Sequence, residues 1–410
     1  MKKVFWIFLL VLLLVFTGFS KETVTVWFAG TTKGLIDVVE NEMIPAFEKN
    51  NPGLNLQVEF IPWGELSTKL TTGLAGGIGP DIFMHGQAAI AGFVQNDLIM
   101  PLDSYISKLE EPDDFGGSMT SGLYKGQTYA VPVFGSGWLM AYRRDFFEEA
   151  GLDPDHAPDT WQELREHALA TTKRAGKNFE VAGINLPVSG IDLQQVWASF
   201  LYENGGKLFD DDFNPVFDSE EGIEALQYYV DLIHTDKVSS EYGLNPVGNL
   251  LPIAAGRAAI SFVNSENMAA IKKYSPKAYT EIELTIPPKK ITRAGFYSFA
   301  GFMVSKKTKD LDSTLKALSF LTSKDSIIKI NEALGSIPPR QSATDAEFVK
   351  SNPMLRKYIE GVEFAYSNPN IPFWVQARDI LVKYLERAVR GVMDPEKALK
   401  QAASEINKLK

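Results

Sequence analysis

Segments with strand-like and helix-like spacing of apolar residues take turns along the first hundred positions. Residues 23–28 are β-branched and aromatic, residues 36–47 carry apolar side chains at helical spacing, and residues 54–60 alternate between apolar and polar. A further helix through residues 66–70 is expected to end at the glycines of 73–79, before a short strand at 82–83. This order predicts a mostly parallel sheet covered by helices, with a ligand site at the carboxyl ends of its strands.

The middle of the chain repeats the alternation, and its last hundred residues are expected to be almost entirely helical. Residues 160–163 form a capping box, and residues 218–221 are expected to cap another helix. Near the end, Asp394 and Pro395 predict the cap and first turn of a final helix. Further strands are predicted at 181–186, 258–263 and 301–305.

The first twenty residues have the organisation of a secretory signal. Lys2 and Lys3 precede an apolar run through residues 4–16, and the small residues Gly18 and Ser20 stand at the positions expected before a cleavage site. The alternative is a retained anchor, although the run is short beside the roughly 20 apolar residues that span a bilayer. We therefore expect an exported protein, in the periplasm or on the cell surface, whose mature chain begins near Lys21.

Composition narrows the class of the mature protein. The chain is 45% hydrophobic and 22% charged, its formal net charge is −10, and it contains no cysteine. These values describe a globular protein that needs no disulfide or thiolate metal site, and they argue against a nucleic-acid partner, which favours a basic face. About 390 residues exceed what one core usually supports, so two lobes are expected.

A set of short motifs, spread over nearly the whole mature chain, resembles the extracellular solute-binding proteins of sugar ABC importers, in the maltose-binding-protein-like class. Each motif is weak alone, but together they occur in the family's order. They lie at residues 24–27 (VTVW), 47–53 (FEKNNPG), 75–82 (AGGIGPDI), 124–132 (YKGQTYAVP), 142–147 (YRRDFF), 158–161 (PDTW), 203–206 (ENGG), 255–260 (AGRAAI), 335–340 (GSIPPR) and 370–374 (NIPFW).

The resemblance implies an α/β fold of two lobes, each a helix-covered mostly parallel sheet, with a helical C-terminal region. Both lobes would be discontinuous in sequence and joined by hinge crossings. The first would comprise residues 21–133 and 299–337, and the second residues 134–298 and 338–410. Closure of the hinge would trap a solute for delivery to the transmembrane subunits of an ABC permease, and the family's usual form is a monomer.

In the first lobe, the resemblance places candidate ligand contacts in loops that follow strands. Thr31 and Lys33 lie in the loop after the first strand, where helix capping is the other interpretation of the threonine. Trp63 follows the second strand and is equally consistent with core packing. His85 and Gln87 follow the third; His85 stands where this class has a cleft tryptophan, so hydrogen bonding would replace stacking there.

The remaining candidates belong to the lobe crossing and the second lobe. Ser136 stands where the family has a cleft carboxylate, and Trp374, within the motif at 370–374, stands where the family stacks a tryptophan on sugar, which makes it the strongest single candidate. For Asp192 helix capping is the alternative. The full set is Ser136, Trp138, Asp192, Gln194, Trp197, Asn264, Glu266, Phe296, Tyr297, Trp374 and Arg378.

These residue types suit a neutral sugar, short oligosaccharide or polyol. Such ligands offer apolar C–H faces for aromatic rings, which make up 11% of the chain, and hydroxyls for a few polar groups. A phosphorylated ligand would call for clustered cations, whereas Lys33, Arg257 and Arg378 are far apart in sequence. No cofactor or metal is expected, because the four histidines are scattered.

A secreted glycosidase is the alternative function, because it needs only two carboxylates at a suitable separation, which spacing in the sequence does not exclude. The serine-x-x-lysine spacings that begin at Ser313 and Ser326 are interpreted as solvated helix faces rather than as acyl-transfer motifs. The family resemblance favours a receptor that is not an enzyme.

Overall fold

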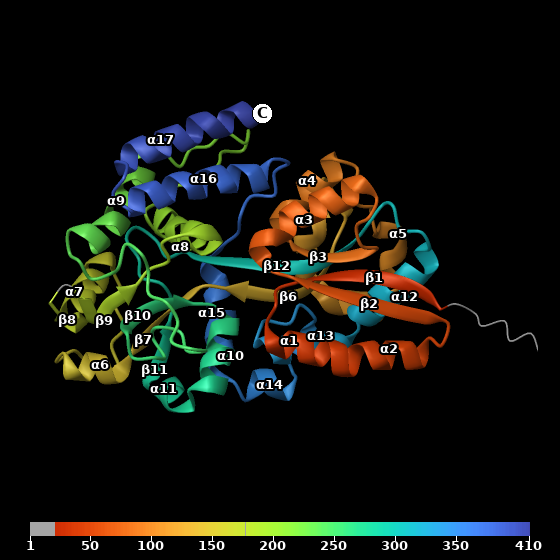
Figure 1. Ribbon diagram of the computed structural model, residues 1–410, viewed down its shortest axis with the longest axis horizontal. Coiled ribbons are helices and arrows are strands. Elements are labelled where there is room, and N and C mark those ends of the chain that lie inside the picture. Colours follow the sequence, from red (N-terminus) through yellow and green to blue (C-terminus); the bar gives the residue numbers. More distant parts are fainter. Residues whose placement is uncertain (1–20, 177) are drawn as a thin grey trace, which may run out of the picture.

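The computed structural model describes residues 21–176 and 178–410. The predicted signal, residues 1–20, lies outside the described residues. Two sheets, each flanked by helices, form two lobes that lie side by side, with β12 and β6 running between them (Figure 1). Within the described ranges, no helix has the length and apolar character needed to cross a membrane.

The sheet of the first lobe is built around β1, whose neighbours β2 and β3 both run parallel to it. The strand and helix predictions for residues 23–60 are confirmed, except that one predicted helix is interrupted by a π-helical turn, η1 (Val39–Met43), which keeps both Val39 and Met43 buried. The strand order is β13-β12-β3-β1-β2, with β6 paired to β12. The strands are β1 (Glu22–Ala29), β2 (Leu54–Ile61), β3 (Ile82–Gly86), β6 (Val131–Gly137), β12 (Gly295–Val304) and β13 (Ala365–Tyr366).

Helices cover this sheet and pack a continuous apolar core against it. The glycine cluster acts as predicted: Gly77 ends α3 in the left-handed conformation, at φ 72°. The helices are α1 (Lys33–Val38), α2 (Ile44–Asn50), α3 (Trp63–Gly76), α4 (Ile90–Gln95), α5 (Asp103–Ile106), α12 (Leu311–Leu321) and α13 (Lys324–Leu334), with 3-10 turns η2 (Gln87–Ala89), η3 (Pro112–Gly122) and η4 (Gln341–Ala343) and a small hairpin, β4 (Leu123–Tyr124) and β5 (Gln127–Thr128).

The sheet of the second lobe has the order β11-β7-β10-β9-β8. It is formed by β7 (Leu139–Arg143), β8 (Lys173–Ala175), β9 (Asn178–Asn185), β10 (Ala258–Val263) and β11 (Ile282–Thr285). Its helices are α6 (Arg144–Glu149), α7 (Trp161–Thr171), α8 (Gly190–Glu203), α9 (Glu220–His234), α10 (Ser265–Tyr274), α11 (Pro276–Glu281), α14 (Glu347–Lys350), α15 (Pro353–Gly361), α16 (Trp374–Val389) and α17 (Pro395–Ile406), with η5 (Val362–Phe364) and η6 (Asn407–Leu409).

Both sheets are mixed. The parallel pairing expected from the β-α-β order is present for β1 with β2 and β3, and for β9 with β10. Antiparallel pairing occurs next to the lobe crossings: β12 runs antiparallel to β3 and β6, and β7 runs antiparallel to β10 and β11. The chain enters the first sheet at β12 from the second lobe, and the second sheet at β7 from the first lobe. The predicted two-lobe α/β fold is therefore confirmed, with more antiparallel pairing than the sequence suggested.

Helix starts follow local chemistry closely. Thr160 Oγ1 accepts from Glu163 N at 3.2 Å, but the Glu163 carboxylate accepts from Asp159 N instead of completing the predicted box. Asp394 caps α17 as predicted, accepting from Lys397 N at 3.1 Å. At 218–221 the capping residue is Ser219.

The solvated faces predicted for Ser313 and Ser326 are wrong. Both serines are buried in the first turns of α12 and α13. Ser313 Oγ donates to Asp310 Oδ2 at 2.8 Å, and Ser326 N donates to Ser323 Oγ at 3.3 Å. Local capping groups need these hydroxyls and amides at the helix starts, and this requirement turns the two serines inward.

The lobes meet where β6 and β12 pass each other. The chain leaves the first sheet after Gly137, and Trp138 N donates to Phe296 O at 3.0 Å as the two crossings run side by side. A Cβ at Gly137 would lie 2.4 Å from the Tyr297 ring, so only glycine permits this approach. Between α13 and η4, the fully buried Arg340 donates to the carbonyls of Glu110 and Glu111 in the first lobe.

Candidate functional site

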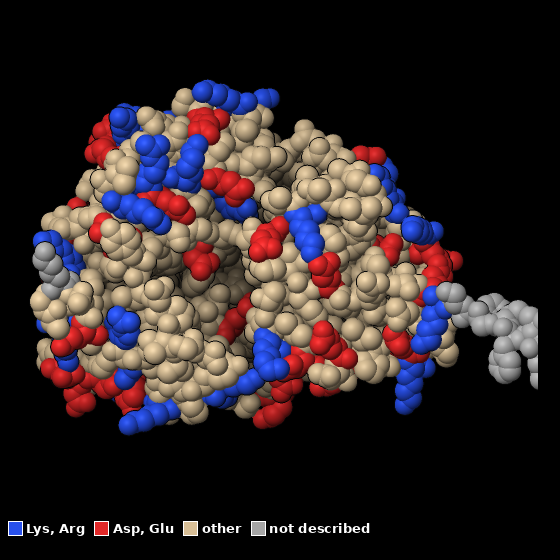
Figure 2. Space-filling model, in the orientation of Figure 1, with Lys and Arg blue, Asp and Glu red and all other residues tan. Residues whose placement is uncertain are grey.

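A cavity of about 390 Å³ lies between the lobes, and the face shown in Figure 2 is hollowed there. Its lining comes from both sides: the start of α3 and the ends of β3 and β6 in the first lobe, α8, α10 and α16 in the second, and β12 between them. The walls combine aromatic rings with a small number of polar groups. This is the composition expected of a small-molecule site in a crevice between two α/β units.

The first-lobe wall is built around Trp63 and His85. Trp63 opens α3 directly after β2 and remains half-buried, with its ring edge-on to His85 and Phe134 at centroid distances of 6.3 Å and 6.4 Å. His85, at the end of β3, is hydrogen-bonded through Nε2 to Ser67 Oγ at 2.9 Å. Burial, reinforced by the charge of Arg378, lowers the pKa of His85 to about 4, so the imidazole is neutral at pH 7.

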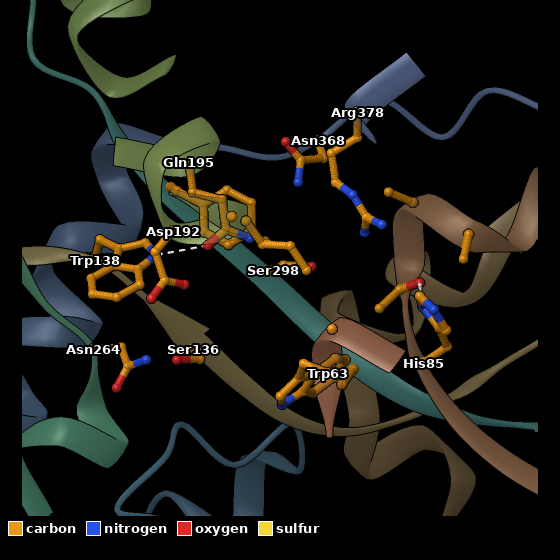
Figure 3. Close-up of a pocket in the computed structure, with 18 of the residues that line it drawn as sticks. Trp63, His85, Ser136, Trp138, Asp192, Gln195, Asn264, Ser298, Asn368 and Arg378 are labelled. Atoms are coloured by element: carbon orange, nitrogen blue, oxygen red, sulfur yellow. Dashed lines mark hydrogen bonds between the residues drawn. The ribbon is translucent and has the colours of Figure 1, made fainter. Parts of the chain in front are cut away.

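The second-lobe wall holds Trp138 in a fixed orientation. The indole Nε1 of Trp138 donates to Gln195 Oε1 at 2.7 Å, and the ring faces the cavity from the opposite side to Trp63 (Figure 3). Gln195 is in turn carried by α8. The site therefore presents an aromatic ring from each lobe, although Trp138 is 7% exposed in this conformation and only part of its ring reaches the cavity. Aromatic rings suit the apolar C–H faces of a sugar.

Two carboxylates, Asp192 and Glu266, line the same wall. No described protein group hydrogen-bonds to Asp192, which lies deep between the walls of the cleft yet remains accessible to water; burial raises the pKa of its carboxyl. Burial also raises the pKa of Glu266, against the hydrogen bond that Glu266 Oε2 accepts from Thr32 Oγ1 of the first lobe at 3.2 Å. Asp192 is thus an acceptor whose hydrogen-bonding capacity the protein leaves unused.

At the other end of the cavity, Arg378 is the cation among the lining residues. Its guanidinium points into the cavity toward His85 in Figure 3, while Nε and Nη2 also donate to the exposed Asp379 at 3.0 Å and 2.8 Å. Asn368 lies beside it, and its Oδ1 accepts from Gln194 Nε2 at 3.2 Å. The cavity is therefore acidic at one end and basic at the other, without a cluster of cations.

Most of the candidate residues are brought together at this cavity. The lining includes Trp63, His85, Ser136, Trp138, Asp192, Asn264, Glu266, Phe296, Trp374 and Arg378. Trp374 is only 3% exposed and packs edge-on against Phe209, so little of its ring is available for stacking in this conformation.

The other candidates lie elsewhere. Thr31 and Lys33 are exposed, and Lys33 pairs with Asp37 one helical turn away. Gln87, in η2, is not among the lining residues. Gln194, Trp197 and Tyr297 are buried in the packing of the second lobe and the lobe crossing, where they do not line the cavity.

Several lining residues escaped the sequence analysis, among them Gln195, Ser189, Ser298 and Asn368. Gln195 illustrates the cause. Gln195 is three residues after Asp192 and lies on the same face of the helix. The completely buried Gln194 is rotated by about 100° about the helix axis from Gln195 and therefore points into the core. The apolar periodicity of α8 would have separated the two.

The model of the bacterial extracellular solute-binding proteins matches residues 31–327 of this chain. The chain belongs to this family. The resemblance stated from the motifs is thereby confirmed, as is the expectation of a solute-binding receptor.

Curated relatives and solved structures agree. A binding protein of Brucella abortus is 25% identical over 375 residues, covering 89% of this chain and 88% of its own length. The mannitol-binding protein of Pseudomonas aeruginosa is 23% identical over 372 residues, covering 83% of this chain and 80% of its own. The crystal structure of an ABC transporter solute-binding protein from Thermotoga lettingae, bound to α-D-tagatose, has a TM-score of 0.84 at 25% identity and covers 94% of this chain and 99% of its own.

Proposed function

We propose that this solute-binding protein captures a neutral polyhydroxylated ligand, a sugar or polyol, between its lobes and delivers it to an ABC permease. The observation that carries the proposal is that Trp63 of the first lobe and Trp138 of the second-lobe wall line one cavity, with the unpartnered carboxylate of Asp192 beside Trp138 (Figure 3). Rings accept the C–H faces of a sugar, and carboxylate and amide groups accept or donate to its hydroxyls. The sugar and polyol ligands named for two similar proteins point to the same class.

The same geometry favours a receptor over a glycosidase. The carboxylates that line the cavity, Asp192 and Glu266, both come from the second-lobe wall. A hydrolase needs an acid and a base or nucleophile that flank the scissile bond. We therefore propose that the protein binds its ligand without turnover.

Export and lobe organisation complete the proposal. The signal at residues 1–20 would be removed on export, leaving a monomeric receptor. The first lobe would comprise residues 21–133 and 299–337, together with the segment that follows, because Arg340 and Ser342 are both anchored to Asp114 in η3. The rest would form the second lobe, and closure about β6 and β12 would bring both walls onto the ligand.

A thermal-shift screen of the mature protein tests the function. The panel contains monosaccharides, oligosaccharides, polyols, sugar phosphates and amino acids. A ligand that binds only the folded protein stabilises it by RT ln(1 + [L]/Kd), about 4 kcal/mol at a thousandfold excess over Kd. We expect a large shift with a neutral carbohydrate or polyol and no product in the recovered ligand. A shift with amino acids alone, or hydrolysis of the sugar, would overturn the proposal.

A further inference from the structure

A second cavity adjoins the first one on the side of the second lobe. It has a volume of about 320 Å³ and shares Trp138, Ser189 and Asp192 with the main cavity. Its floor lies at the carboxyl ends of β9 and β10, where Asn185 and Ser261 pair across the sheet. This is the edge at which α/β sheets bind ligands, and neither Asn185 nor Ser261 lines the main cavity.

The floor of the second cavity carries a hydroxyl without a partner. Ser261 is only 3% exposed, and its Oγ makes no hydrogen bond to any described protein group. A buried hydroxyl left in this state is disfavoured, because it has lost water and gained nothing in return. A ligand hydroxyl in the cavity would satisfy it.

The start of α10 supplies a donor to each cavity. Asn264 and Asn267 form a reciprocal capping box, in which each amide oxygen accepts from the backbone N–H of the other residue, at 2.8 Å and 3.1 Å. Their oxygens are used in the cap, so their amide NH₂ groups are the donors that remain. Asn264 lines the main cavity and Asn267 the second, so one helix start equips both.

The outer wall of the second cavity is a loop spanning residues 242–252. Val247 and Leu250 close its tip with reciprocal backbone hydrogen bonds of 2.9 Å and 3.1 Å. Tyr242 lines the cavity although 76% of its surface is exposed, which leaves a large aromatic ring available at the opening. A sugar unit in this cavity would cover part of the ring.

We propose that the second cavity is a subsite for a further sugar unit, so that the ligand is a short oligosaccharide rather than a single hexose or hexitol. Trp138 stands at the junction, held by Gln195, with Asp192 and Ser189 also reaching both cavities. One unit would occupy the space between Trp63 and Trp138, and the next would reach Ser261 and Asn267. This inference rests on the proposed function and specifies the length of its ligand.

Isothermal titration with matched series tests the inference. Each series contains a monosaccharide, its disaccharide and its trisaccharide: glucose with maltose and maltotriose, mannose with mannobiose and mannotriose, xylose with xylobiose and xylotriose, together with mannitol. We expect the disaccharide of at least one series to bind at least tenfold more tightly than its monosaccharide. Equal or tighter binding of a monosaccharide or of mannitol would overturn the subsite while leaving the proposed function intact. Failure of all carbohydrates to bind would overturn both.

Variants assign the extra affinity to the second cavity. Ser261→Ala removes only the unpartnered hydroxyl, so it should weaken disaccharide binding about twofold to tenfold and leave the monosaccharide affinity unchanged. Ser265→Ala is the matched control, because Ser265 is also buried with an unpartnered Oγ but lines neither cavity. Tyr242→Ala, at an exposed position, should likewise weaken the disaccharide selectively. Unchanged disaccharide affinity in both Ser261→Ala and Tyr242→Ala would refute the subsite.

Discussion

Replacing Asp192 by asparagine should separate ligand binding from folding, because the protein itself leaves this carboxylate without a hydrogen-bond partner among the described residues. In the unliganded protein, Asp192 accepts no hydrogen bond from the described residues, and burial raises the pKa of its carboxyl. Asp192 also lies in the first turn of α8, where a negative charge is favourable, so Asp192→Asn should change the free energy of unfolding little. If a ligand hydroxyl donates to the carboxylate, the variant loses a hydrogen bond to a charged group. Such a bond contributes about 1.5–3 kcal/mol, which corresponds to about 10- to 150-fold in Kd.

Two assays on the same preparation measure these effects. Isothermal titration with the sugar selected in the thermal-shift screen gives Kd, and urea denaturation without ligand gives the free energy of unfolding. Asp211→Asn provides a matched control, since Asp211 is an exposed carboxylate that lines neither cavity. Unchanged affinity in Asp192→Asn would show that the carboxylate does not contact ligand. Lower stability without ligand would show that the carboxylate supports the fold and would contradict the prediction.

Three further outcomes are expected. Burial raises the pKa of Asp192 and Glu266, whereas hydrogen bonds from ligand hydroxyls favour the ionised carboxylates. Ligand binding should therefore release protons, and the affinity should increase as pH rises above the ordinary carboxyl range. Isothermal titration in buffers of different ionisation enthalpy measures the number of protons released. Because burial lowers the pKa of His85 from 6.5 to about 4, the free energy of unfolding should decrease by about 2–3 kcal/mol as pH falls through that interval. Urea midpoints of the His85→Gln variant should depend less on pH over the same range. Gly137→Ala should destabilise the protein by about 1–3 kcal/mol through the clash with Tyr297, whereas Gly53→Ala, where no atom lies within 4 Å of the added carbon, should not.

Local chemistry made much of the fold predictable. The strand periodicity of residues 54–60 and the cap at Asp394 depend on neighbours in sequence, and both are present in the structure. The π-helical turn at Val39–Met43 was not predictable in this way, because it depends on which side chains the neighbouring sheet and α13 leave room to bury. The antiparallel pairing of β12 with β3 and β6 was not predictable either, because the chain forms most of the second lobe before it returns to the first sheet at β12.

The site was less accessible to sequence reasoning, because its residues are separated by up to about three hundred positions and only the fold brings them together. Family motifs located the loops, and within a loop or helix the choice between adjacent residues depended on packing. Gln194 and Gln195 show the difference: the first is completely buried, and the second orients Trp138. Tyr297 was displaced from the cavity for a similar reason, since Gly137 leaves the space that its ring fills.

The two walls of the cleft are chemically unequal, and this inequality bears on how closure is driven. The first lobe presents mainly Trp63 and the neutral His85. The second presents Trp138 and most of the polar groups, namely Asp192, Asn264, Glu266 and Arg378. A sugar can satisfy the hydroxyl-seeking groups from the second lobe alone, but its second apolar face is covered only when the first lobe closes on it. Ligand would therefore dock first on the second lobe, and burial of its exposed face against Trp63 would supply the differential affinity that shifts the lobes to the closed state.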